Sequence, residues 1–216
     1  MIVITIWGRQ SSSNVQAVMW CVAELHLPHK RIDAGFTYGL VNSPSYLAMN
    51  PNGTVPTIQD DEQTPLFETG AIVRYLGSVY GHETFWPKTI DARAQVDQWS
   101  EWAKLNISGK FTSPIFWQVV RTPENRQNAS QIAKAVNEFE KKLRIANSQL
   151  ENRAFLASEH FTAADIQFGH VLFRYFDIAI ERVNLPAISE YYERLTQRPA
   201  FKTHVMVSYE ELRNTF

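Results

Sequence analysis

The sequence predicts two domains: an N-terminal α/β domain with the element order βαβαββα, and a C-terminal domain made of helices alone. Three observations predict this division. Strand signals are confined to the first part of the chain, and helical spacing of apolar residues dominates from residue 91 onward. A turn-rich stretch that contains Pro87 separates the two patterns. We therefore expect a first domain at 1–81, a linker at 82–90 and a helical domain at 91–216.

The first domain opens with a βαβ unit. Residues 2–7 form an apolar, β-branched run, which is typical of a buried strand. A polar turn follows, and apolar residues then recur at helical spacing over 15–25, with Ser13 or Asn14 as the predicted N-cap. Residues 31–33 resemble a second strand. A strand, a helix and a strand in this order predict a parallel strand pair.

A short helix, a hairpin and a longer helix are expected to complete the first domain. Residues 44–49 predict the short helix. The runs 57–59 and 65–67 flank a polar turn and should pair as an antiparallel hairpin. Apolar residues at helical spacing over 72–79 predict a helix that Gly81 ends.

Five helices are expected in the second domain. Asp91 can cap the first, which extends to residue 107, and the spacing at 132–150 predicts the second. The third covers 162–176 and opens with a Thr-x-x-Asp capping box. Pro186 suits the first turn of the fourth helix, and 201–213 predict the last.

Composition and charge exclude several classes of function. Charged residues make up 20% of the chain and the net charge is −1, which gives no electrostatic reason to bind nucleic acid or an acidic membrane surface. Apolar runs stay shorter than the 18 or so residues of a membrane span. The N-terminus lacks the features of a signal peptide, so we expect a cytoplasmic protein.

The cysteine and histidine content argues against a metal site. Cys21 is the single cysteine, which excludes a disulfide within the chain and a cysteine-based zinc site. We expect this side chain to be a small buried apolar residue. The six histidines are scattered without the spacing of metal ligands, so no metal is expected.

Two polar stretches predict a ligand site. Asn-Pro and Asn-Gly turn dipeptides at 50–53 lead into Val55, which the following proline keeps extended. Pro56 cannot donate a ladder hydrogen bond, which leaves the backbone groups of Val55 free for a ligand. Glu68 and Thr69 then place a carboxylate and a hydroxyl at the start of an apolar helix. Together they suggest a pocket for the amino and carboxyl groups of a small zwitterion.

The order of elements and four motifs resemble the cytosolic glutathione transferases. The motifs are Asn-Pro-x-Gly-x-Val-Pro at 50–56, Glu-Thr-x-Ala-Ile-x-x-Tyr-Leu at 68–76, Trp-Pro at 86–87 and Thr-x-x-Asp at 162–165. They occur in register and in order, and the resemblance covers essentially the whole chain. Within the family it is greatest to bacterial, serine-type members of the theta or nu kind.

The resemblance implies a thioredoxin-like first domain that binds glutathione along Thr54, Val55 and Pro56. Pro56 would be cis, and the backbone of Val55 would pair with the cysteinyl part of the tripeptide. Glu68 would hold the γ-glutamyl ammonium, and the hydroxyl of Thr69 with nearby helix amides would hold its carboxylate. Thr69 replaces the commoner serine and keeps the hydroxyl.

The chemistry of the family needs a thiolate. Lowering a free-thiol pKa of about 8.5 by two units takes about 2.7 kcal/mol. One hydroxyl hydrogen bond to an ion contributes ~1.5–3 kcal/mol and a helix N-terminus ~0.3–1, so a single serine is nearly enough. Alignment on Val18, the position of the family's helix valine, puts the activating hydroxyl on Ser12. Asn14 is the second candidate and Ser11 the third, and the turn lacks a tyrosine.

The glycyl end of glutathione has no obvious partner in the sequence. The family often places Lys or His near the Asn-Pro turn, whereas this chain has Gly53 and Thr54 there. Asn50, Tyr38 or a residue across a dimer interface remain alternatives for binding the glycyl carboxylate.

The resemblance implies a homodimeric enzyme that conjugates glutathione, as co-substrate, to electrophilic and partly apolar small molecules. The helical domain would form the second pocket, with Trp7, Phe111 and Trp117 as its candidate aromatic residues. Glutathione-dependent disulfide reduction is an alternative, which the Ser12-x-Asn14 pattern favours. A non-catalytic binding or scaffold protein is another, although such a protein has no need of the serine turn and the glutathione motifs together.

Overall fold

The computed structural model describes residues 3–216, so that Ile2 of the first predicted strand lies outside the described part. The predicted order βαβαββα is confirmed in the first domain. Its elements are β1 (Ile4–Trp7), α1 (Ser13–Glu24), β2 (His29–Ile32), α2 (Pro44–Met49), β3 (Thr57–Asp60), β4 (Leu66–Phe67) and α3 (Thr69–Tyr80).

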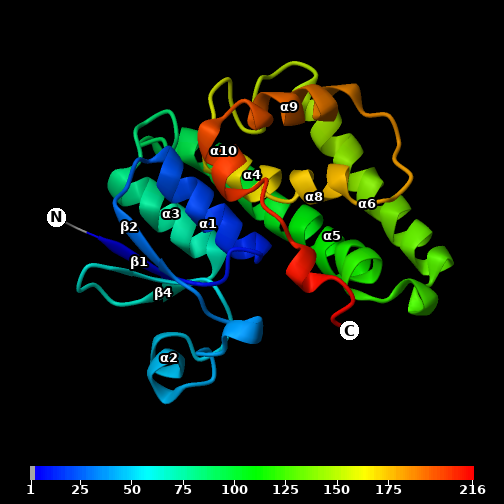
Figure 1. Cartoon of the computed structure of the whole chain (residues 1–216). Coiled ribbons are helices and arrows are strands. Elements are labelled where there is room, and N and C mark those ends of the chain that lie inside the picture. Colours follow the sequence, from blue (N-terminus) through cyan, green and yellow to red (C-terminus); the bar gives the residue numbers. More distant parts are fainter. Residues whose placement is uncertain (1–2) are drawn as a thin grey trace.

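The strands form one mixed sheet in the order β2-β1-β3-β4. β1 and β2 are parallel, and β3 pairs antiparallel with both β1 and β4, which confirms the predicted βαβ unit and hairpin. α1 and α3 lie together on one side of the sheet and α2 lies on the other (Figure 1). This is the thioredoxin-like arrangement that the resemblance implies.

The register of the sheet brings three chain segments to one edge. Thr57 of β3 is opposite both Trp7 of β1 and Phe67 of β4. The residues one step beyond this row are Gly8, Pro56 and Glu68. The turn after β1, the proline before β3 and the start of α3 are therefore neighbours, although they are up to 60 residues apart in sequence.

The second domain is helical, and the helices predicted at 132–150 and from Pro186 are confirmed. Two stretches wind as π-helix, at Lys104–Ser108 and Thr112–Arg121, and join α4 and α5 into one long helical segment. The α-helices are α4 (Ile90–Ala103), α5 (Gly109–Phe111), α6 (Ala129–Leu150), α7 (Ala163–Gly169), α8 (Leu172–Asp177), α9 (Pro186–Thr196) and α10 (Pro199–His204).

Two predicted N-caps are wrong. Ser12, not Ser13 or Asn14, is the N-cap of α1, because its backbone is extended (φ −81°, ψ 121°) and Ser13 is already helical. Thr89 precedes α4, so Asp91 lies inside the first turn of that helix. There its carboxylate still interacts favourably with the helix dipole.

One predicted helix is also divided, and another is shorter than predicted. The third ends at Gly169 and restarts at Leu172, and between them the ring of His170 bonds the Ile166 carbonyl (Nδ1 to O 3.0 Å). A side chain that takes a helix carbonyl competes with the backbone for it. The Thr162 capping box at the start of α7 is confirmed.

The last predicted helix, over 201–213, stops at His204. The remaining residues run down between the two domains as the red segment of Figure 1. Here the backbone N–H groups of Asn214 and Phe216 donate to the carbonyls of Val120 and Arg121 (3.0 Å each). The tail therefore satisfies the carbonyls at the end of the π-helix instead of continuing its own helix.

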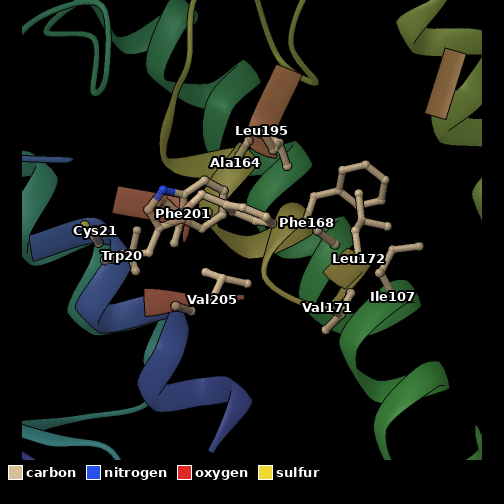
Figure 2. Close-up of a cluster of buried hydrophobic side chains, with 14 of the residues drawn as sticks. Trp20, Cys21, Ile107, Ala164, Phe168, Val171, Leu172, Leu195, Phe201 and Val205 are labelled. Atoms are coloured by element: carbon tan, nitrogen blue, oxygen red, sulfur yellow. The ribbon is translucent and has the colours of Figure 1, made fainter. Parts of the chain in front are cut away.

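The core joins the two domains through α1. Trp20 of α1 packs against Phe201 of α10 with ring centroids 4.8 Å apart, and both are fully buried (Figure 2). Glu24, one turn after Trp20, forms an ion pair with Arg198 in which two N–O distances are 2.7 and 2.6 Å. At Gly169 of α7, an added Cβ would lie 2.6 Å from Leu195 Cδ1, so only glycine permits this close packing.

Buried His170 should make stability depend on pH. Burial, assisted by the charge of Lys104, lowers its pKa to about 3, whereas an unfolded histidine titrates near ~6.5. Between these values the unfolded chain binds a proton that the folded chain does not. The free energy of unfolding should therefore fall as pH drops from 6.5 toward 3.

Urea denaturation at several pH values tests this prediction. His170→Gln should flatten the dependence relative to wild type, while His160→Gln, at an exposed position, should leave it as in wild type. Equal slopes for His170→Gln and wild type would contradict the assignment.

Candidate functional site

A cavity of about 320 Å³ lies at the sheet edge where the register gathers the predicted site. Its walls come from both domains: the turn after β1, the segment after β2, the turn before β3, the π-helix, α8 and the C-terminal tail. The lining residues are Arg9, Ser11, Ser12, Ser13, Asn14, Gly35, Phe36, Val41, Gly53, Thr54, Val55, Thr112, Trp117, Arg121, Arg174 and Leu212.

The serine turn, residues 9–14, is held close to α1 by Gly8. A Cβ at Gly8 would lie 2.4 Å from Val15 Cγ2, so a larger residue would push the turn away from the helix. The N–H of Gly8 donates to the Ile32 carbonyl (2.8 Å) and that of Arg9 to the Ala34 carbonyl (3.1 Å). The turn therefore continues the β1–β2 ladder to the mouth of the cavity.

The three candidate thiol activators line the cavity but differ in their bonds. The hydroxyl of Ser11 donates to the carboxylate of Glu211. Within the described residues, the side chain of Ser12 makes no capping bond to α1, and Ser12 is 8% exposed. The Oδ1 of Asn14 accepts from Lys104 Nζ (3.4 Å), which leaves its NH₂ group as a donor.

Lys104 is a site residue that the sequence reading missed. It lies on the π-helix of the second domain, 90 residues from Asn14, and is half-buried. Burial lowers the pKa of its ammonium, and the charges of Glu68 and Glu101 oppose this shift. An ammonium beside the serine turn favours a negative ligand there.

The turn before β3 is fixed by a polar clamp. Val55–Pro56 is a cis peptide bond, as the resemblance implies. The Thr54 carbonyl accepts from Tyr46 Oη (2.6 Å) and from Asn50 Nδ2 (2.9 Å), and the Asn50 amide also donates to Thr57 Oγ1 (3.1 Å). Thr54 and Val55 line the cavity while Pro56 is buried beneath them.

The hydrogen bonds of the clamp bear on which residue could bind the glycyl carboxylate of glutathione. The Asn50 side chain is 1% exposed and its amide is engaged, so it does not face a ligand. Tyr38 lies at the surface and donates to Glu211 Oε2 (3.2 Å). Neither alternative is therefore free in this structure.

Glu68 and Thr69 lie at the start of α3, beside Pro56. Glu68 has a left-handed backbone (φ 67°) and an exposed side chain, while Thr69 is the first helical residue and is 1% exposed. They are outside the lining of the 320 Å³ cavity, one step along the sheet edge from Thr57. The charge of Glu68 opposes the lowering of the pKa of Lys104, the residue that donates to Asn14 of the serine turn.

The three aromatic candidates are placed differently. Trp117 lines the cavity. Phe111 is 1% exposed and packs against Phe139, with centroids 5.3 Å apart, so it belongs to the core of the helical domain. Trp7 is half-buried in β1 and does not line the cavity.

Three arginines that no sequence motif predicted, Arg9, Arg121 and Arg174, line the cavity. Arg174 of α8 is 3% exposed, donates to the Ser11 carbonyl (2.6 Å) and stacks on Phe116 (4.4 Å to the centroid). Burial lowers its pKa to about 9. Arg121 lies over Trp117 (5.3 Å) and over Phe216 of the tail (3.9 Å), and Arg9 follows Gly8. Only the fold brings them together.

A larger cavity of about 510 Å³ lies elsewhere, between α6 and the segment after α8. Its buried carboxylate, Glu140, already accepts from Tyr175 Oη (3.1 Å) and from the Val183 N–H (2.8 Å), so it is a structural group. Over residues 3–216, acidic, histidine and cysteine side chains form no cluster that could hold a metal. In the same residues, no helix is long and apolar enough to cross a bilayer.

Comparisons with known proteins agree with this geometry. The family model for the N-terminal domain of glutathione S-transferase matches residues 2–78, and the model for the C-terminal domain matches 110–199. Glutathione S-transferase GstB of Escherichia coli K12 is 33% identical over 205 residues, which cover 94% of this chain and 98% of that protein. The chain belongs to the glutathione S-transferase family.

Solved structures show the same fold over the whole chain. The theta class glutathione S-transferase of Xanthomonas axonopodis pv. citri with glutathione bound has a TM-score of 0.91 and 38% identity, covering 97% of this chain and all of that one. Its apo form has a TM-score of 0.83. A region of elongation factor 1-gamma from Danio rerio is 30% identical over 172 residues, which are 78% of this chain and 37% of that protein.

The clamp at Thr54 should contribute to the stability of this transferase. Asn50→Ala removes the two hydrogen bonds that the Asn50 amide donates to Thr54 and Thr57 and the two that its Oδ1 accepts from Asn52, so the free energy of unfolding should fall by about 1–3 kcal/mol. Urea denaturation measures the change. Asn42→Ala, at an exposed position before α2, should change it little, and equal effects of the two variants would contradict the clamp.

Proposed function

We propose that this chain conjugates the thiolate of glutathione to electrophilic, partly apolar small molecules. The observation that carries the proposal is the meeting of the serine turn and the Thr54–Pro56 turn in one cavity. Ser12 and Asn14 offer donors there, and Thr54 and Val55 of the second turn line the same cavity. In the reaction a C–S bond forms as the leaving group departs with its electron pair, or as an electron pair moves onto an activated double bond.

The tripeptide is proposed to lie along the sheet edge. Glu68 holds the γ-glutamyl ammonium and Thr69, with the first amides of α3, holds its carboxylate. The backbone of Val55 then pairs with the cysteinyl part. The adjacency of Glu68 and Pro56 in the β3–β4 register supports this order, and the Xanthomonas relative was solved with glutathione bound.

The thiol is proposed to be activated by Ser12 first, Asn14 second and Ser11 third. The Ser11 hydroxyl already donates a hydrogen bond to Glu211. The Ser12 hydroxyl, among the described residues, makes no capping bond to α1. The cations Lys104 and Arg174 add to the preference for a thiolate, because nearby positive charge lowers the pKa of an acid. A serine hydrogen bond with these charges can supply the ~2.7 kcal/mol of a two-unit shift.

The helical domain is proposed to form the electrophile pocket next to this thiolate. The apolar wall of this pocket is formed by Trp117 and Thr112 of the π-helix and by Leu212 of the tail. Phe111 supports the wall from the core. The pocket is thus built from the second domain, while the glutathione site is built from the first.

We also propose that the protein is a homodimer that detoxifies electrophiles in the cytoplasm, where thiols are kept reduced. The exposure of large apolar side chains on the α3–α4 side supports a partner surface: Val79 is 52% exposed and Ile90 77%. The domain division at 82–90 is part of the proposal, because α3 ends at Tyr80 and α4 begins at Ile90.

A binding protein without turnover is the second candidate, since a region of an elongation factor is a relative of this chain. Disulfide reduction through a thiol of the protein is disfavoured. Cys21 is fully buried within α1, and burial raises its pKa far above the ordinary range. Reduction of a disulfide by glutathione itself would still use the Ser12–Asn14 turn. Assays with an aryl halide and a small disulfide distinguish the three activities.

Ser12→Ala should lower kcat/KM for conjugation at least ten-fold, about 1.4 kcal/mol, and raise the pKa of bound glutathione. The pH dependence of the rate with 1-chloro-2,4-dinitrobenzene measures both quantities. Ser11→Ala is the matched control, with a smaller loss expected because Glu211 holds that hydroxyl. A greater loss in Ser11→Ala would move the assignment to Ser11.

Glu68→Gln should weaken glutathione binding about ten- to hundred-fold, because a charge-assisted hydrogen bond contributes ~1.5–3 kcal/mol. Calorimetric titration with glutathione gives the Kd. Glu62→Gln, in the exposed turn between β3 and β4, is the control and should bind as wild type does. An unaltered Kd in Glu68→Gln would refute the γ-glutamyl assignment.

A further inference from the structure

Among the described residues, four arginines are paired with a carboxylate, and the three arginines of the cavity are among those that are not. Arg31, Arg74, Arg198 and Arg213 each form an ion pair with a carboxylate. Across the described residues, Arg9, Arg121 and Arg174 form none. Unpaired guanidinium groups thus gather in the cavity.

These guanidinium groups are buried or half-buried, so the absence of an anionic partner among the described residues is unfavourable for them. The Nε atoms of Arg9 and Arg174 are buried and, within residues 3–216, have no hydrogen-bond partner. Arg174 is 3% exposed and lines the cavity, so the cavity wall includes a buried cation. A buried cation is destabilising unless an anion or several acceptors compensate it. Guanidinium groups bind carboxylates preferentially, by two parallel hydrogen bonds.

One carboxylate of the chain already reaches this place. Glu211, from the C-terminal tail, accepts from Ser11 Oγ and from Tyr38 Oη (3.2 Å), and its charge acts on Arg9. Glu211 is itself exposed and lies on a short 3₁₀ turn, Glu210–Leu212. A carboxylate of the chain therefore lies beside Ser11, and its charge acts on one of the three arginines, Arg9.

We infer that the cluster of Arg9, Arg121 and Arg174 is a carboxylate-binding subsite of the electrophile pocket. The inference rests on the proposed function and names its substrate class: small electrophiles that carry a carboxylate near the reacting carbon, such as halogenated or unsaturated acids. Arg121 and Arg174 belong to the helical domain, which supplies the electrophile pocket. The carboxylate is held there while its neighbouring carbon faces the thiolate at Ser12.

Glutathione is a second source of carboxylate, through its glycyl end. Two observations favour the electrophile. Arg174 donates to the Ser11 carbonyl, at the serine turn, and Arg121 stacks on Trp117 of the electrophile pocket. The glycyl end would instead follow Val55 toward Gly53. The experiment therefore includes an arm for each source.

Iodoacetate and iodoacetamide provide a matched pair of probes, because they share the carbon and the leaving group and differ in charge. With either one, the glutathione thiolate forms a C–S bond as the C–I bond breaks and iodide leaves with the electron pair. No oxidant or proton is required. Cys21 is fully buried with a raised pKa, so alkylation of the enzyme itself is disfavoured and can be checked by mass spectrometry.

The test compares the enzymatic rate with each probe, divided by its uncatalysed rate with glutathione. We expect wild type to accelerate iodoacetate at least ten-fold more than iodoacetamide. Arg121→Gln should remove most of this preference, while Arg126→Gln, at an exposed position nearby, should keep it. Glu211→Gln should act in the opposite direction and lower KM for iodoacetate, because it removes the competing carboxylate.

The other outcomes separate the inference from the proposed function. Equal acceleration of both probes would overturn the subsite and leave the transferase activity intact. Acceleration of neither, and of 1-chloro-2,4-dinitrobenzene either, would overturn both. If Arg121→Gln keeps the preference but raises KM for glutathione, and not for glutathione amidated at its glycine, the cluster holds the glycyl carboxylate and the inference is wrong.

Discussion

The site depends on one hydrogen bond between the domains, from the guanidinium of Arg174 to the carbonyl of Ser11 (2.6 Å). The donor comes from α8 and the acceptor from the turn that precedes α1, 163 residues away. Because the carbonyl belongs to the backbone, the bond fixes the path of the serine turn whatever its side chains do. The position of the candidate thiol activators is therefore set by the docking of the helical domain.

That docking is supported by apolar burial and an ion pair farther along α1. Trp20 packs between the two domains, and Glu24 binds Arg198 one turn later. α1 is thus held at both ends by the second domain, at its start through Arg174 and near its end through Arg198. Loosening either contact would move the helix whose N-terminal turn carries the candidate thiol activators. The division of roles between the domains is consequently incomplete: the glutathione site needs the helical domain to keep its shape.

Much of the first domain could be predicted from local signals, because each of its strands, its hairpin and its proline turn is determined by a short stretch of sequence. The site residues that were missed have another origin. Lys104 and Arg121 lie on a π-helix, where bonds run five residues apart, as from Thr122 N–H to the Trp117 carbonyl (3.0 Å). Thr112 and Trp117 both line the cavity, although residues five apart in an α-helix would point about 140° apart. A reading that assumes the α-helical period names Trp117 and misses Thr112 and Arg121, which line the same cavity. Arg174 gave no signal because only tertiary packing places it under the serine turn.

A residue with a hydroxyl group is the N-cap of both α1 and α7, but only at α7 does that hydroxyl cap the helix. At α7, Thr162 and Asp165 satisfy each other's donors in a complete capping box, so that helix start is closed to ligands. At α1 and α3, within the described residues, no side chain caps the first amides, although Ser12 has the side chain to do so. A helix start without a side-chain cap is about 1 kcal/mol less stable than a capped one. Two uncapped helix starts at one sheet edge leave amides and a positive dipole end for anions. In the proposed binding mode, the thiolate of glutathione lies at the start of α1 and its γ-glutamyl carboxylate at the start of α3, so each anion meets an uncapped helix start.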